Sequence, residues 1–174
     1  MKTHFIFIRH GEPRYDETQN IWQKSVGYNF GKLTENGEDQ ALEVAKNPLL
    51  KDADIIVSSP YTRALQTAAI ISRITGIKLV IENDLHEWNP DTNFIFDFED
   101  NLPFEEYLKN KGIHQLDDKY RWEAYKDIKK RVELSLLRYK NYKKVIVVSH
   151  GIVMSTVTRF DDVIEYCGIR EVDI

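Results

Sequence analysis

The amino-acid sequence predicts an α/β fold with a mainly parallel sheet. Four short runs rich in isoleucine and valine are bounded by turn signals, at residues 5–8, 55–57, 77–81 and 145–148. Continuous apolar runs of this kind are typical of strands that are covered on both faces. Helical patterns lie between the runs, and a regular alternation of strand and helix indicates helices packed on a parallel sheet.

The first predicted helix follows the first strand. Thr34 can cap its amino end, and Pro48 ends it, because proline cannot continue a helix. One face between them collects the apolar residues Ala41, Leu42, Val44 and Ala45. Apolar residues at this spacing indicate a helix that packs against the core.

Three further helices are predicted. The second begins with Ser59 as N-cap and Pro60 as first residue, and it ends at Gly76. A fourth helix is expected after Gly151. The third helix carries one apolar stripe, made by Trp122, Tyr125, Ile128, Val132, Leu136 and Tyr139.

Residues 88–119 do not follow this alternation. The segment mixes prolines and a glycine with many aromatic and acidic residues. A linker would carry fewer aromatic residues, so we interpret the segment as an insertion packed over the sheet edge, within a single domain of residues 1–174. Its phenylalanines at 94, 96 and 98 repeat with period two, which favours core or edge-strand packing, with pocket lining as the second use.

Composition excludes several classes of protein. The 174 residues carry a net charge of −4, so nothing draws the chain as a whole to nucleic acid or to an acidic membrane. The single cysteine, Cys167, rules out an internal disulfide and a cysteine-based metal site. No apolar run reaches the length of a membrane span, and the first run is too short for a signal peptide. We therefore expect a cytoplasmic protein.

Chemically active side chains follow the predicted strands directly. Arg9 and His10 come after the first strand, Arg63 after the second, Glu87 after the third and His150 after the fourth. In open α/β sheets the ligand crevice lies outside the carboxyl ends of the strands. These residues are therefore expected to meet in one crevice.

Such a set of side chains suits phosphate chemistry. Two guanidiniums match phosphate oxygens in a planar fork, and a neutral imidazole is a nucleophile near pH 7. A second imidazole, if protonated, can stabilise charge on the transferring oxygens, and a carboxylic acid can protonate the leaving oxygen. Gly11 and Gly151 are expected to let the backbone approach the ligand.

The same residues carry a family resemblance. In order along the chain, the motifs are Arg9-His10-Gly11-Glu12, Leu33-Thr34-Glu35-Asn36-Gly37 with Gln40-Ala41, Ser58-Ser59-Pro60 with Arg63-Ala64 and Gln66-Thr67-Ala68, and Ser149-His150-Gly151. Together they resemble the histidine phosphatase superfamily, which includes the cofactor-dependent phosphoglycerate mutases. The resemblance implies a three-layer α/β/α sandwich and a phosphorylated His10. It also implies phosphoryl binding by Arg9, Arg63 and His150, and proton donation by Glu87.

The chain departs from the family pattern in three places. The segment after Glu87 lacks the usual glycine, so Asp91 is a second candidate for the acid. The residues after Glu12 lack the common pattern, which leaves Asn20 as a weak candidate for a phosphate contact. Little chain follows His150, which is short for a mutase.

The predicted function is hydrolysis of a small phosphate monoester through a phosphohistidine, as in a metal-independent histidine acid phosphatase-type enzyme. No metal or organic cofactor is expected, because no His-x-His or His-x-x-x-His spacing occurs. A phosphoglycerate mutase and a non-catalytic phosphoryl-binding module remain as alternatives. The acidic residues of 88–119 predict a preference for one phosphate over two if the segment lies over the crevice, but they can equally form a solvated outer face. No oligomeric state is predicted.

Overall fold

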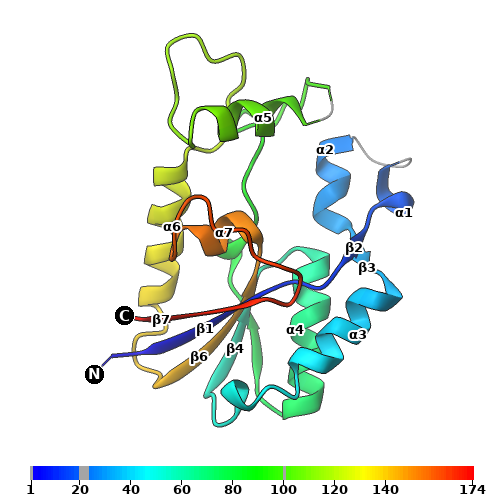
Figure 1. The fold of residues 1–174 in the computed structure, drawn as a ribbon, viewed down its shortest axis with the longest axis vertical. Coiled ribbons are helices and arrows are strands. Elements are labelled where there is room, and N and C mark those ends of the chain that lie inside the picture. Colours follow the sequence, from blue (N-terminus) through cyan, green and yellow to red (C-terminus); the bar gives the residue numbers. More distant parts are fainter. Residues whose placement is uncertain (1, 20–23, 100) are drawn as a thin grey trace.

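The computed structural model describes residues 2–19, 24–99 and 101–174 (Figure 1). A five-stranded sheet has the order β5-β4-β6-β1-β7. Its strands are β1 (His4–Arg9), β4 (Ile55–Ser58), β5 (Leu79–Ile81), β6 (Lys144–Ser149) and β7 (Ile169–Asp173). The first four run parallel, and β7 runs antiparallel to β1. This mixed, mainly parallel sheet confirms the predicted fold class.

All four predicted strands are present, with small changes at their ends. The run predicted at 77–81 forms a strand only over Leu79–Ile81. The edge strand β7 was not predicted from the sequence. It contains Arg170, Glu171 and Asp173 between its apolar residues, so it lacks the continuous apolar run that marks a strand covered on both faces.

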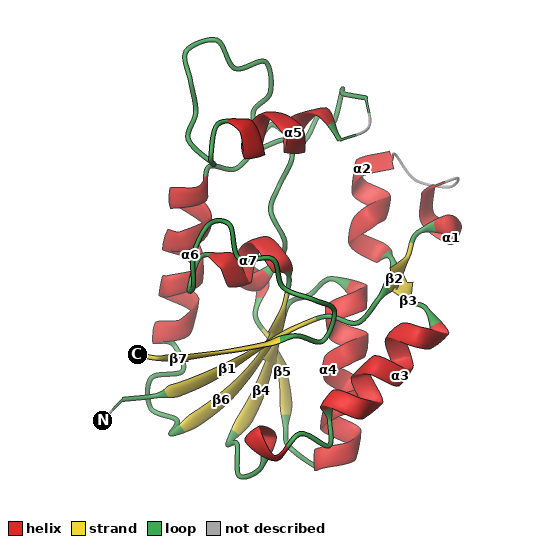
Figure 2. Ribbon diagram, viewed as in Figure 1, coloured by secondary structure: helices red, strands yellow, loops and turns green. Residues whose placement is uncertain are grey.

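Side chains of alternate residues on β1 enter two separate cores. Phe5 and Phe7 pack with α6 (Tyr125–Leu137) and α7 (Gly151–Ser155) on one face of the sheet. Ile6 and Ile8 pack on the other face, which α4 (Thr62–Thr75) covers. The neighbouring α3 (Glu35–Val44) lies against α4 on this second face (Figure 2). The α/β/α arrangement is therefore present.

Not all helix ends follow the predicted signals. The third predicted helix is α6 (Tyr125–Leu137), so Trp122 and Tyr139 of the predicted stripe lie outside it. Thr34 caps α3 by accepting a 2.9 Å hydrogen bond from the Gly37 amide, and Gly76, at φ +74°, ends α4. However, α4 begins at Thr62 rather than at Pro60. The Ser59 hydroxyl lies 2.7 Å from the His150 Nε2 and accepts from the Tyr61 amide at 3.2 Å, one residue before the helix begins.

Short elements connect β1 to α3 and complete the remaining loops. A small hairpin pairs β2 (Pro13–Arg14) with β3 (Lys32–Leu33). The short helices α1 (Asp16–Gln19) and α2 (Lys24–Gly27) lie between these two strands in the sequence. Single 3-10 turns occur at Tyr28–Phe30, Pro48–Leu50 and Asn83–Leu85.

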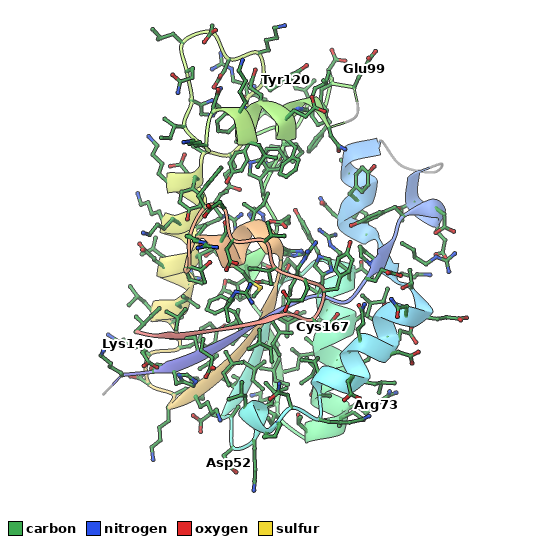
Figure 3. All side chains as sticks on the ribbon, viewed as in Figure 1. Asp52, Arg73, Glu99, Tyr120, Lys140 and Cys167 are labelled. Atoms are coloured by element: carbon green, nitrogen blue, oxygen red, sulfur yellow. The ribbon has the colours of Figure 1, made fainter. Side chains whose placement is uncertain are left out.

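The 88–119 segment lies beyond the carboxyl ends of the parallel strands rather than over a lateral edge of the sheet (Figure 1). Its one helix is α5 (Leu102–Lys109). Glu99 and Tyr120, labelled in Figure 3, both lie far from the sheet. No strand forms at residues 94–98, because Phe94 and Phe96 have φ of +58° and +55°, which a strand does not allow. The expected edge-strand packing of these phenylalanines is therefore wrong.

Candidate active site

The carboxyl ends of β1, β4 and β6 bring four of the predicted residues together. Arg9 ends β1 and is paired in register with Ser149, the last residue of β6. His10 and His150 directly follow these two strands, and their ring centroids lie 5.2 Å apart. Arg63 lies in the first turn of α4 and reaches His10. The predicted convergence of these side chains is therefore found in the fold.

His10 is held in one orientation and one tautomer. Its side chain is buried, and Nδ1 lies 2.7 Å from the Gly11 carbonyl oxygen. A carbonyl only accepts hydrogen bonds, so Nδ1 carries the proton and Nε2 carries the lone pair. The Arg63 Nε–H donates to this Nε2 at 3.2 Å. The lone pair of the proposed nucleophile thus lies against the positive group expected to bind phosphate.

The surroundings of His10 keep its imidazole neutral. Burial lowers its pKa well below 6.5, and the neighbouring charge of Arg63 lowers it further. The contact with the Gly11 carbonyl raises the pKa, and Arg9 lowers it, but these effects are smaller. A neutral imidazole at neutral pH can act as a nucleophile without first losing a proton.

Arg63 is fixed from several sides. The side chain is buried, and Nη1 donates a 2.7 Å hydrogen bond to the Tyr28 carbonyl. The Thr67 hydroxyl donates to the Arg63 carbonyl at 2.8 Å and accepts from the Gly11 amide at 3.1 Å. Thr67 therefore ties the first turn of α4 to the loop that follows His10.

Arg9 approaches the same place from β1. Its Nη1 donates to the Ile164 carbonyl, and its guanidinium carbon lies 4.4 Å from the centre of the Tyr166 ring. Its Nε is buried and has no hydrogen-bond partner among the described residues. A buried N–H without a partner is costly, so it marks a place where a ligand oxygen would be favourable.

His150 has a second unpartnered nitrogen. Its ring is fully buried, and Nε2 lies 2.7 Å from the Ser59 hydroxyl, whereas Nδ1 has no partner among the described residues. Burial lowers the His150 pKa well below 6.5, and Arg63 and His10 lower it further. In this state the ring is neutral, so the protonated form considered for phosphate binding would require the charge of a bound anion.

The two candidate acids have different environments. Glu87 is half-buried, and its Oε1 accepts a 2.8 Å hydrogen bond from the Trp88 amide. Asp91 is buried, and its carboxylate accepts from three backbone amides, those of Asn93, Ile95 and Phe96, at 2.7–2.9 Å.

These contacts favour Glu87 over Asp91 as the candidate acid. Burial alone would raise the Asp91 pKa, but the three amide hydrogen bonds outweigh it and lower the pKa below the ordinary value. Asp91 therefore stays ionised and organises its own loop, which disfavours it as a proton donor. Glu87 lines the same cavity as Arg9 and Arg63, so it is the better candidate.

That cavity has a volume of about 760 Å³. Arg9, Arg63, Glu87 and Gly151 line it, whereas His10 and His150 lie buried behind this lining. Much of the remaining wall is apolar and comes from the 88–119 segment. Its apolar lining residues include Trp88, Pro90, Ile95, Phe96, Phe98 and Phe104.

The two glycines that were expected to approach the ligand differ in role. A Cβ on Gly11 would lie 2.4 Å from the Gly37 carbonyl oxygen, so Gly11 is required by close packing against α3, not by a ligand. A Cβ on Gly151 would lie 3.7 Å from the Arg9 Nε, an ordinary contact distance, and Gly151 does line the cavity. Asn20, the other predicted contact, lies outside the described residues.

Several contributors to the site were missed from the sequence. Ser59 was interpreted as a helix cap, yet its place in the Ser-Ser-Pro motif, before the helix, was the available signal. Tyr166 packs on Arg9 and His10, with ring centroids of Tyr166 and His10 5.8 Å apart. Nothing in the local sequence around Tyr166 indicates this contact, which arises because the chain returns beside β1 to form β7.

The described residues contain neither a cluster of metal ligands nor a helix that could cross a membrane. No group of three or more histidine, cysteine, aspartate or glutamate side chains is arranged to hold a metal ion within residues 2–19, 24–99 and 101–174. In the same part of the chain, no helix is long and apolar enough to cross a membrane.

Comparisons with known proteins show the family of the chain. Residues 5–160 match the histidine phosphatase superfamily (branch 1). A protein of Hydrogenobacter thermophilus with the proposed name phosphoserine phosphatase 2 is 32% identical over 151 residues, which make up 83% of this chain and 71% of that protein. The uncharacterised phosphatase PhoE of Bacillus subtilis is 30% identical over 154 residues, or 86% of this chain and 72% of that protein.

Solved structures share the fold. The crystal structure of phosphoglycerate mutase from Bacillus anthracis matches with a TM-score of 0.72 at 20% identity. The match covers 99% of this chain and 88% of that one. Phosphatases and mutases are thus both found among the distant relatives.

Proposed function

The chain belongs to branch 1 of the histidine phosphatase superfamily, and we propose that it hydrolyses phosphate monoesters through a phosphohistidine at His10. One observation carries the proposal. The Nε2 lone pair of His10 lies 3.2 Å from the Arg63 Nε, in a buried site where the Arg9 Nε and the His150 Nδ1 have no partner among the described residues. A phosphoryl group provides the oxygens that such nitrogens need.

The first step transfers the phosphoryl group to the protein. The His10 Nε2 attacks phosphorus in line, the N–P bond forms, and the bond from phosphorus to the ester oxygen breaks. Arg9, Arg63 and His150 bind the three remaining oxygens, and protonated Glu87 gives its proton to the leaving alcohol. Glu87 is then a carboxylate, and His10 carries the phosphoryl group.

The second step returns the protein to its starting state. Water attacks phosphorus while the Glu87 carboxylate takes one of its protons, and the N–P bond breaks. Inorganic phosphate leaves, His10 is again a neutral imidazole, and Glu87 is again protonated. The arginines supply the positive charge that a metal ion supplies in other phosphoryl-transfer enzymes.

A phosphoglycerate mutase would use the same residues but would keep the phosphoryl group from water between two half-reactions. Two curated relatives that match over most of this chain are named phosphatases, which favours hydrolysis. A relative named a probable phosphoglycerate mutase matches over only 46% of the chain. The test offers the protein a panel of monoesters, including 3-phosphoglycerate, and measures released phosphate and 2-phosphoglycerate separately. Phosphate release from several esters is the expected result. Formation of 2-phosphoglycerate without release would identify a mutase, and binding of phosphate without either product would identify a binding module.

A further inference from the structure

Part of the aromatic wall of the cavity is built by one ordered loop. In residues 91–98, the buried Asp91 carboxylate accepts the amide protons of Asn93, Ile95 and Phe96. Phe94 and Phe96 both adopt left-handed backbone conformations, which bulky side chains rarely do. Such conformations persist only where the surroundings impose them, and here the Asp91 carboxylate imposes them. The hydrogen bonds to Asp91 therefore fix the backbone that carries the side chains of this loop.

Two pairs of aromatic side chains line the cavity, one from this loop and one from the residues beside it. Phe96 and Phe98 line the cavity, with ring centroids 6.4 Å apart in an edge-to-face arrangement. Trp88 and Phe104 also line it and meet edge-to-face at 5.7 Å. The Trp88 indole N–H already donates to the Glu123 carbonyl at 3.0 Å, so its polar group is not available to a ligand. This wall suits an apolar or aromatic group.

The charged residues that line the cavity also favour a substrate with a single anionic group. Among the described lining residues, the only cations are Arg9 and Arg63, and both are assigned to the phosphoryl group. The other charged lining residues are Glu87, Asp97 and Asp162. Asp162 is paired with Arg170 at 2.9 Å, whereas the Asp97 side chain is exposed. A second phosphate or a carboxylate on the substrate would find no further cation among the described lining residues and would be repelled by Asp97.

We propose that the preferred substrate is a compact monoester with a single phosphate, an apolar or aromatic group on its alcohol and no second anionic group. The phosphate binds between the arginines, and the apolar group packs against Phe96, Phe98 and Trp88. This inference rests on the proposed phosphatase function and names the substrate class of that site.

The test compares 2-phenylethyl phosphate with glycerol 1-phosphate. Both are primary alkyl esters, so their leaving groups are similar and the ratio of their kcat/KM values reports recognition of the alcohol. The expected ratio is roughly tenfold in favour of the phenyl compound, in line with burial of an aromatic ring. 3-Phosphoglycerate, which carries a carboxylate and no ammonium, should be a poor substrate, and Asp97→Asn should raise its kcat/KM.

Two phenylalanines of the same loop give a matched pair of variants. Phe96→Ala should reduce the ratio to within about threefold of unity, because it removes part of the wall. Phe94→Ala should change the ratio much less, because Phe94 shares the left-handed backbone but is 72% exposed and does not line the cavity. Its ring meets only the Phe96 ring edge-to-face, with centroids 6.1 Å apart, among the phenylalanines of this loop. If Phe96→Ala does not fold, as judged by circular dichroism, the wild-type ratio alone decides.

The outcomes separate this inference from the function on which it rests. If glycerol 1-phosphate or 3-phosphoglycerate is hydrolysed as well as 2-phenylethyl phosphate, and His10→Ala abolishes these activities, the substrate inference is wrong and the phosphatase function stands. If no ester releases phosphate in a His10-dependent way, the proposed function itself fails.

Discussion

The reactivity of His10 depends on which nitrogen is protonated. The Gly11 carbonyl 2.7 Å from Nδ1 selects the tautomer with the lone pair on Nε2, which accepts from the Arg63 Nε–H at 3.2 Å. Burial and the charge of Arg63 keep the ring uncharged. Both effects come from atoms that the fold brings to the ring. A motif shows that a histidine follows a strand, but only the structure shows how its two nitrogens differ.

Arg63 tests whether the shape of the cation matters as well as its charge. Its Nε and Nη1 donate to His10 and to the Tyr28 carbonyl at the same time, which a lysine ammonium cannot reproduce. We expect Arg63→Lys to lower kcat/KM by about tenfold or more. Arg73→Lys, an exposed position on the same helix, is the control and should have no effect. Equal rates for Arg63→Lys and wild type would mean that Arg63 serves only the structure.

The two buried imidazoles predict how stability changes with pH. In the unfolded chain, histidine has a pKa of about 6.5. In the folded protein, the pKa values of His10 and His150 lie well below this value. Below pH 6.5 the unfolded chain therefore takes up protons that the folded chain does not. The stability that the two neutral imidazoles contribute is fully present above pH 6.5. It is lost as the pH falls toward their lowered pKa values. Each contributes a slope of up to about 1.4 kcal/mol per pH unit.

Urea unfolding between pH 7.5 and 5.5, in buffer without phosphate, measures this slope. His150→Asn should reduce it, because one buried group that resists protonation is gone. His4→Gln is the control, since His4 is a surface side chain bonded to Asp173 and Glu171. An unchanged slope in His150→Asn would mean that His150 is not held neutral in the folded protein.

At the residue scale, the sequence predicted the identities of the side chains that meet and less of what surrounds them. Arg9, His10, Arg63 and His150 were placed correctly at the strand ends because a parallel sheet sends all its carboxyl ends to one side. The sequence left Asp91 open as an acid, because three backbone amides bonding to one carboxylate depend on loop geometry that has no sequence pattern.

At the scale of elements, α6 holds the loop that carries Glu87. The Arg131 guanidinium donates to the carbonyls of Asp84 and His86 at 2.6 and 2.8 Å, and it lies 3.4 Å from that of Glu87. Glu123 accepts from the same guanidinium at 2.6 and 2.9 Å. Arg131 touches no reacting atom in the proposed mechanism, so it is a positioning residue for Glu87.

Replacing Arg131 tests this positioning through the leaving group. Arg131→Lys loses most of these contacts, and we expect turnover of an alkyl phosphate to fall by about tenfold. Formation of the phosphoenzyme from 4-nitrophenyl phosphate should fall less, because its leaving oxygen needs little protonation. Lys130→Ala, exposed on the same helix, is the control. Equal losses on both esters would assign Arg131 a purely structural role.

The elements were predicted best where local sequence alone determines them. Apolar runs marked β1, β4, β5 and β6, and the Thr34 cap and Gly76 stop marked helix ends. β7 was missed because three of its five residues are charged, so the edge strand lacks a continuous apolar run. The period of two in the phenylalanines suggested a strand, but the Asp91 carboxylate holds their backbone in a turn conformation instead.

At the scale of the whole molecule, most acidic residues of the 88–119 segment do not line the cavity. Glu106 accepts from the Lys119 and Tyr120 amides and the Trp122 indole, and Asp118 bonds to Asn110 and His114. These acids brace the 88–119 segment internally. Of that segment's acids, only Asp97 is among the described lining residues of the cavity. The sequence could not separate these uses, because both place carboxylates in the same stretch of chain.

Removal of metal ions tests whether the arginines alone supply the positive charge that hydrolysis requires. Arg9 and Arg63 already supply positive charge at the site, so dialysis against EDTA should leave the hydrolysis rate unchanged. The rate is measured before dialysis, after it, and after addition of magnesium or zinc. Activity that is lost and then restored by either metal would overturn the mechanism.

The central claim is that His10 carries the phosphoryl group, and digestion with trypsin can test it directly. Cleavage after Arg9 and Arg14 releases His10-Gly11-Glu12-Pro13-Arg14, which contains one histidine and no serine, threonine or tyrosine. The protein is mixed with substrate, denatured within milliseconds at alkaline pH to preserve phosphohistidine, and digested for mass spectrometry. The account predicts a phosphoryl group on this peptide in wild type, and neither adduct nor turnover in a folded His10→Ala variant. A phosphoryl group on another peptide, or His10→Ala activity within about tenfold of wild type, would contradict it.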